Sequence, residues 1–233
     1  MKKITILLAL VAAVFTGCKN YDPNDSNTLS TGQIEMKIYP DKNNYISFNA
    51  ITQKITIDWG DGTVDDLIPN GINKNFSHEY SNRNLQTVKI NTEEITGDAH
   101  NIGETTAWGI NFGFTCDSCL LQELKFGNCS ELKAINCSSN QLTTLDVSKC
   151  TALIFLNCDN DNLTTLDVSK CTALCYLICI GNNLSASALN ALFNSLPTRK
   201  STDYAVLYYW GNPGSATCDK TIAANKGWNI GGN

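Results

Sequence analysis

One pattern returns every 21 residues between Phe114 and Leu184, and it constrains the fold more than any other feature of the sequence. Three columns of residues keep this spacing: Phe114, Ile135, Leu156 and Leu177; Cys116, Cys137, Cys158 and Cys179; and Leu121, Leu142, Leu163 and Leu184. Two units repeat almost as text, because the segment at 140–153 recurs at 161–174 with only its first two letters changed. A fixed period of this length predicts stacked units that bury their apolar faces against one another.

Within one unit, the apolar positions resemble the leucine-rich repeat pattern LxxLxLxxNxL. Leu156 and Cys158 are two residues apart, so both point to one face of a short strand and are expected to face inward. Asn140 and Asn182 follow the strands where an amide can bond the backbone of the turn, whereas Asp161 interrupts this column. The predicted fold class is therefore α/β, a leucine-rich repeat solenoid of 21-residue units with parallel strands, preceded by a small β-sandwich-like region.

The first 17 residues are typical of a secretory signal, because Lys2 and Lys3 precede an apolar run at 4–15 that is too short to span a bilayer. The run ends at Phe15-Thr16-Gly17-Cys18, which resembles the bacterial lipobox, although Phe15 stands where Leu is usual. That resemblance implies cleavage before Cys18 and lipidation of this cysteine, including palmitate. The acyl chains would anchor the protein to the outer membrane of the bacterial cell envelope, where we expect it to be displayed on the surface. A plain signal peptide is the alternative.

The segment at 18–31 is polar and is expected to be a flexible tether. The whole chain has 17 basic and 22 acidic residues, a net charge of −5, and loss of Lys2 and Lys3 makes it 15 − 22 = −7. No basic cluster follows the signal segment. We therefore expect no nucleic-acid partner, because phosphate binding needs a Lys or Arg surface.

Residues 32–97 are predicted to form a β-sheet region, with strands at 34–39, 45–50 and 54–59 and a hairpin signal at Asp61-Gly62. The segment ITIDWGDGT at 55–63 and the later HEY at 78–80 resemble PKD and immunoglobulin-like modules. A cluster of four carboxylates is open to two interpretations, a calcium site or a turn beside a packed Trp59: Asp58, Asp61, Asp65 and Asp66.

The remaining boundaries follow from changes in pattern. Residues 98–110 are expected to be a connector, 111–184 the repeats, and 185–233 a capping repeat with helices. Val88, Ile90 and Ile95 imitate the repeat spacing and are expected to form an irregular first coil. Leu207, Tyr209 and Asn212 stand 30 residues after Leu177, Cys179 and Asn182, which predicts one more strand of the stack.

The whole arrangement resembles the leucine-rich repeat surface lipoproteins of Bacteroidetes, which are related to internalin and BspA-like proteins. The resemblance rests on the lipobox, ITIDWGDGT, HEY, the LTTLDVSKCTAL units and the segment NNLSASALNALFNSLP. It implies surface display, adhesion or scaffolding and protein binding, with no catalytic residues and no cofactor to transfer.

Seven of the 11 cysteines fall in two columns at inward positions, where buried thiols suit packing better than disulfides or metal ligation. Cys116 and Cys119 form a CxxC, which leaves disulfide formation open in an exported protein. No GxSxG, HExxH or phosphate loop is present, so we expect no enzyme activity and no metal site.

Residues flanking the inward positions become more aromatic along the repeats and are expected to face outward. The predicted ligand-binding residues are Phe155, Asn157, Asp159, Tyr176, Ile178, Tyr208 and Trp210. Exposed rings of this kind suit a protein partner, from the host or the bacterial surface, and also the apolar faces of a glycan. A purely structural cross-strand ladder is the third possibility.

Overall fold

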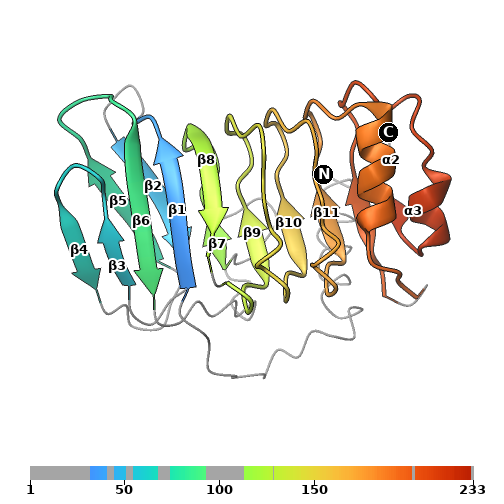
Figure 1. The fold of residues 1–233 in the computed structure, drawn as a ribbon, viewed down its shortest axis with the longest axis horizontal. Coiled ribbons are helices and arrows are strands. Elements are labelled where there is room, and N and C mark those ends of the chain that lie inside the picture. The colour runs from blue at the N-terminus through green and yellow to red at the C-terminus, as the bar shows by residue number, and fades with distance from the viewer. Residues whose placement is uncertain are drawn as a thin grey trace, which may run out of the picture.

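The computed structural model describes residues 32–40, 45–50, 55–67, 74–92, 113–127, 129–200 and 203–231. The signal segment, the tether, Cys18 and the connector at 98–110 lie outside these ranges. In the described part of the chain the strands form two sheets, one of five and one of eight strands. Figure 1 shows the five-stranded sheet at one end of the molecule, the eight-stranded sheet running on through a row of stacked coils, and two helices at the other end.

The five-stranded sheet has the order β4-β3-β6-β1-β8, and its neighbouring strands run antiparallel. Its members are β1 (Gly32–Ile38), β3 (Ile55–Asp58), β4 (Val64–Leu67), β6 (Gln86–Thr92) and β8 (Leu121–Phe126). Alternation places Ile34, Met36 and Ile38 of β1 in the core, where each is at most 2% exposed. The hairpin predicted at Asp61-Gly62 joins β3 to β4.

The eight-stranded sheet begins with an antiparallel pair, β2 (Tyr45–Ala50) and β5 (Lys74–Glu79). Six strands then run parallel to one another: β7 (Phe114–Thr115), β9 (Ala134–Asn136), β10 (Phe155–Asn157), β11 (Tyr176–Ile178), β12 (Val206–Tyr208) and β13 (Asn229–Ile230). Their register confirms the sequence period, because Leu156 pairs with Ile135 on one side and Leu177 on the other. Leu177 pairs with Leu207, so the strand expected 30 residues later is present.

The described residues are mostly strand and turn, with few helices, so the α/β expectation overestimated the helical part. The reason lies on the returning side of each coil, where the chain makes short turns. The Cys171 N–H donates to the Val168 carbonyl at 2.9 Å, and the Leu174 N–H donates to the Cys171 carbonyl at 3.0 Å. A 21-residue unit leaves too few residues there for a packed helix.

Helices occur where the connections are longer. The helix α2 (Ala186–Ser195) begins at Ser185, whose hydroxyl accepts a 3.2 Å hydrogen bond from the Ala188 N–H, and it buries Leu189, Leu192 and Phe193. The helix α3 (Thr221–Asn225) precedes the final strand β13. These elements cover the last coil, as a capping repeat must.

The two predicted regions share their sheets across the connector. β8 pairs with β1, and β7 pairs with β2, so segments on either side of 98–110 lie in the same sheets. Phe114 of β7 and Phe126 of β8 meet edge to face, with ring centroids 6.0 Å apart. One continuous cluster of buried apolar residues runs from Ile34 to Trp228.

The expectation of an irregular first coil at Val88 and Ile90 was wrong. Val88 and Ile90 do not begin a repeat coil but lie in β6, at the centre of the five-stranded sheet, because their alternation is that of an antiparallel strand. Ile95 lies outside the described residues. Leu121 keeps its buried position but opens β8, a six-residue strand that leaves the coil pattern to pair with β1.

Candidate functional site

The outward side chains of the repeat strands form an aromatic ladder, which we define as Phe155, Tyr176, Tyr208 and Trp210. Phe155 and Tyr176 are aligned in register and stack with centroids 5.1 Å apart and planes 11° apart. Tyr208 lies two residues further along its strand than Val206, the residue that pairs with Tyr176. The Tyr208 ring centroid is 5.7 Å from that of Tyr176, and Trp210 meets Tyr208 edge to face with centroids 5.1 Å apart. The ladder therefore crosses from β10 to β11 between paired residues and then continues along the direction of β12.

The expectation that the whole ladder is open to solvent was wrong. Phe155 is only 2% exposed and Tyr176 only 4%, and burial raises the pKa of the Tyr176 hydroxyl well above its usual range. Part of the cause is the ladder itself, because each stacked ring covers a face of its neighbour. Tyr208, Trp210 and Ile178 remain partly exposed, and they are the members of the predicted set with apolar surface left to offer.

The polar members of the set, Asn157 and Asp159, are partly exposed but engaged locally. The Asn157 side-chain oxygen accepts a 3.2 Å hydrogen bond from the Asp159 N–H, and the Asp159 carboxylate accepts one of 3.1 Å from Asn160 Nδ2. Burial also raises the pKa of Asp159, which makes its ionised form more costly than at an open surface. These groups serve first to shape the turn after β10.

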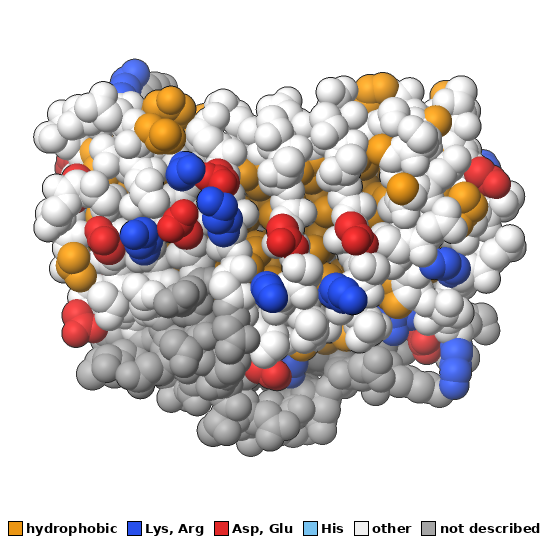
Figure 2. Space-filling view, viewed as in Figure 1, with side chains coloured by type: hydrophobic (Ala, Val, Ile, Leu, Met, Phe, Trp, Pro, Cys, Tyr) orange, Lys and Arg blue, Asp and Glu red, His pale blue; other side chains and the backbone are white. Residues whose placement is uncertain are grey.

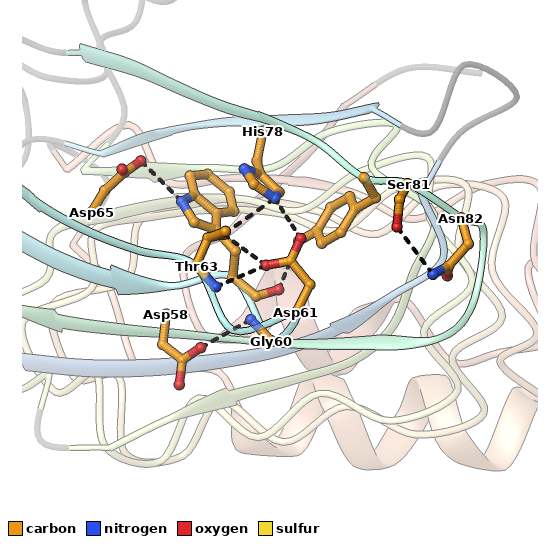
Figure 3. Close-up of polar contacts among 10 residues, drawn as sticks. Asp58, Gly60, Asp61, Thr63, Asp65, His78, Ser81 and Asn82 are labelled. Carbon is orange, nitrogen blue, oxygen red and sulfur yellow. Dashed lines mark hydrogen bonds and ion pairs between the residues drawn. The ribbon is translucent and has the colours of Figure 1, made fainter.

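A second group of polar residues closes the DWGDG turn, and Figure 3 shows its members converging on Asp61. Asp61 accepts hydrogen bonds from the Thr63 hydroxyl at 2.6 Å and backbone at 3.0 Å, and its other oxygen lies 2.8 Å from His78 Nε2. These contacts lower the pKa of Asp61 to about 2, with the Thr63 side chain as the largest cause and His78 next. The sequence contained DWGDG and HEY but did not indicate that Asp61 and His78 pair.

Aromatic packing extends this group from one sheet to the other. The Trp59 ring stacks on His78 at 4.9 Å, and His78 meets Tyr80 edge to face at 4.5 Å. The Tyr80 hydroxyl donates to the Trp59 carbonyl at 2.9 Å. Since Trp59 follows β3 and His78 lies on β5, the group fastens the five-stranded sheet to the eight-stranded one.

The four carboxylates once open to a calcium interpretation each have their own partner. Besides Asp61, the Asp58 carboxylate accepts from the Gly60 N–H, Asp65 from Trp59 Nε1 and Asp66 from the Thr56 hydroxyl. Trp59 is 1% exposed. The contacts favour the interpretation of a turn beside a packed tryptophan.

The cysteine columns lie inside the coils, as the period predicted. Cys137, Cys158 and Cys179 are fully buried free thiols, and each Sγ–H donates to a carbonyl of the next coil at 3.5 to 3.7 Å. Burial raises the pKa of Cys179 to about 12 and that of Cys137 and Cys158 well above the usual range. Thiols in this state are poor nucleophiles, so the columns are packing features.

Charged side chains gather on the five-stranded sheet, where acidic and basic groups are interleaved (Figure 2). Lys125 lies 2.7 Å from Glu123 and 3.8 Å from Glu35, and Lys37 also reaches Glu123. A depression of about 410 Å³ beside them is lined by Ile34, Glu35, Lys89, Ile90, Asn91, Lys125, Phe126 and Gly127. Of the charged groups on its wall, Lys125 and Glu35 form an ion pair of 3.8 Å.

Comparison with known proteins adds little to this geometry. No family model and no curated protein matches the chain. Among solved structures, the chain is similar to the functional domain of InlJ from Listeria monocytogenes, which is described as including a cysteine ladder. The identity is 24%, the match covers 43% of this chain and 31% of that chain, and the TM-score is 0.25. None of the helices among the described residues is long and apolar enough to cross a membrane.

Proposed function

We propose that this chain is a leucine-rich repeat solenoid protein, displayed as a lipoprotein on a bacterial surface, that binds a protein partner through the end of its repeat sheet. The class is supported by the 21-residue register and by the asparagine column that bonds successive coils. A non-enzymatic adhesion or scaffold role is the function that suits such a rigid sheet. The observation that carries the binding proposal is the aromatic ladder, which ends in partly exposed Tyr208 and Trp210.

Trp210 is the residue on which we expect binding to depend most. Its indole leans edge-on against Tyr208, and the Trp210 carbonyl accepts a 2.9 Å hydrogen bond from the Gly181 N–H, which fixes the backbone beneath the ring. A large ring on a rigid support loses little conformational entropy when a partner covers it. One part of the Tyr208 ring is covered, because Gly231 lies directly against it.

A glycan ligand is the alternative, since partly exposed rings with Asn157 and Asp159 nearby also suit sugars. The local hydrogen bonds of these two polar residues leave fewer groups for sugar hydroxyls. The burial of Phe155 and Tyr176 also shortens the apolar platform. A protein partner is therefore the preferred proposal.

The binding proposal is tested by comparing Trp210→Ala with Tyr204→Ala. Tyr204 is 52% exposed just before β12 and has no place in the ladder, so it is a matched aromatic control. Loss of an interface tryptophan costs about 2 kcal/mol or more, or roughly 30-fold in Kd. We expect that loss for Trp210→Ala, and near wild-type affinity for Tyr204→Ala, toward a surface protein captured by the full chain.

Equal binding by Trp210→Ala and wild type would contradict the site. A parallel glycan array decides between the ligand classes: sugar binding that Trp210→Ala abolishes would replace the protein proposal with the glycan alternative.

The lipid anchor is tested separately through Cys18. If Cys18 is acylated, Cys18→Ala removes incorporation of a palmitate analogue and releases the protein from the membrane fraction, because acyl chains supply the anchoring energy. Cys218→Ala is the control, since Cys218 is a partly exposed free thiol near α3 and should leave labelling intact. Labelling that survives in Cys18→Ala contradicts the lipoprotein proposal.

A further inference from the structure

A column of buried asparagines bonds each coil to the next. Asn182 shows the arrangement: its Nδ2 donates to the Cys158 carbonyl at 2.7 Å and the Cys179 carbonyl at 3.3 Å, while its Oδ1 accepts from the Leu163 N–H at 2.9 Å. Asn140 repeats these contacts in the preceding coils and Asn212 in the last one. Each amide thus donates through its Nδ2 to at least two backbone carbonyls and accepts through its Oδ1 from a backbone N–H of the preceding coil.

Asp161 occupies the same column, 21 residues after Asn140 and 21 before Asn182. It is only 5% exposed, and its Oδ1 accepts a 3.1 Å hydrogen bond from the Leu142 N–H, as an asparagine oxygen would. Its Oδ2 is buried and has no hydrogen-bond partner in the described part of the chain. A buried polar atom left in this state is costly and needs an explanation.

The repeat identifies what Oδ2 faces. Asn182 donates to carbonyls 24 and 3 residues before it, and the same offsets from Asp161 lead to Cys137 and Cys158. Because the backbone repeats with the 21-residue period, the carbonyl oxygens of Cys137 and Cys158 are the groups that Oδ2 should face. An ionised carboxylate would therefore point a negative oxygen at other oxygens, where the asparagines place an N–H donor.

We propose that Asp161 is a buried proton-binding site, at which a carboxylic acid replaces the asparagine amide and donates its hydrogen to a backbone carbonyl, so that the stack of coils weakens as pH rises. The proton restores the donor that the column requires. Loss of the proton leaves a buried charge without a counter-ion. The proposal is independent of the ligand and of the membrane anchor.

The surroundings of Asp161 favour the neutral form. The titratable groups that interact with its carboxyl are the Asp159 carboxyl and the thiols of Cys137 and Cys158, and no cation is among the groups that shift it in the described structure. Burial is the largest cause and raises the pKa of Asp161 from 3.8 to about 7, against the lowering effect of the N–H groups of Leu142 and Asn140.

The sign of the pH dependence follows from linkage. The folded chain holds a proton that the unfolded chain releases above a pH of about 4, so stability is fully present below that pH and is lost as pH rises to about 7. Over this window one retained proton changes the unfolding equilibrium constant by up to about tenfold per pH unit. Above the folded pKa the loss stops growing.

The test is denaturant unfolding of the full chain at several pH values with Asp161→Asn. The amide needs no proton, so the unfolding constant of wild type divided by that of Asp161→Asn should rise up to about tenfold per pH unit from pH ~5 to ~7 and then level. Taking this ratio cancels the titration of other groups. A ratio that does not change with pH overturns the proposal.

Two further variants keep the test decisive. Asn182→Asp places a second carboxyl in the column and should add a loss of stability of the same sign with rising pH. Asp159→Asn retains Asp161 and should keep most of the wild-type pH dependence.

An infrared measurement reads the proton directly. The wild-type chain near pH 6 should show the C=O stretch of a protonated carboxylic acid that Asp161→Asn lacks. Absence of that band from wild type, or an Asn182→Asp variant whose stability loss is independent of pH, contradicts the assignment.

Discussion

Single side chains decide how the DWGDG turn is held. Asp61 is partly exposed, yet its oxygens are bonded by Thr63 and His78, and this fixes the loop that carries Trp59 into the core. The turn also needs glycine at position 60, where φ is +85° and an added Cβ would lie 2.6 Å from the Thr87 carbonyl. Local hydrogen bonding and backbone freedom therefore act together at one hairpin.

We predict that the ionised Asp61 carboxylate stabilises the folded state and that this contribution is lost in strong acid. Its folded pKa of about 2 lies below the usual 3.8, so its stabilising effect is present above pH 3.8 and is lost as pH falls through about 2. Asp61→Asn should lower the free energy of unfolding at pH 7 by about 1 kcal/mol, after allowance for solvent screening.

Acid titration of the two proteins measures this effect, and their stability difference should shrink towards pH 2. Asp66→Asn, which alters an exposed carboxylate bonded to Thr56, is the control and should show no such convergence. A difference that is constant with pH would show that Asp61 acts through shape alone.

Some single-residue properties were beyond the sequence. Alternation indicated correctly that Phe155 and Tyr176 point away from Leu156 and Leu177, but it does not tell whether that face is covered. The sequence showed that Asp161 replaces an asparagine in the column. It could not show that the Asp161 Oδ2 atom is buried without a hydrogen-bond partner in the described structure. Sequence gives the direction of a side chain more readily than its surroundings.

At the scale of the elements, the short strands depend on their neighbours rather than on their own length. β10 has three residues, and Leu156 at its centre is fully buried between Ile135 and Leu177, which are also fully buried. The period predicted these strands well because identical spacing imposes identical partners. The pairing of β6 and β8 with β1 was not predicted, because it joins segments far apart in sequence.

We predict that Leu156→Ala costs about 2 to 5 kcal/mol in the free energy of unfolding, since it leaves a cavity between coils. Denaturant unfolding measures the loss. Leu85→Ala removes a leucine that is 46% exposed and should change stability by less than about 0.5 kcal/mol. A Leu156→Ala cost as small as that of the control would mean that the coils do not share this core.

At the scale of the whole molecule, the β region and the repeat region are distinct in sequence but share both sheets in the structure. The repeat sheet continues through β7 into β2, and β8 returns to the other sheet, so the first coil belongs to both. At the far end α2, α3 and β13 cover the last coil (Figure 1). Arg199 strengthens this end by donating to the carbonyls of Thr172 and Leu174.

The near-identity of the segments at 140–153 and 161–174 has a consequence for how such a chain changes over generations. Residues that pair between β9, β10 and β11 stand 21 positions apart. Unequal recombination between the two copies would therefore remove or add one whole coil and leave the remaining partners matched. The length of the stack can therefore vary in steps of 21 residues without a new fold having to arise. Both capped ends would be carried along unchanged, and only the distance between them would differ.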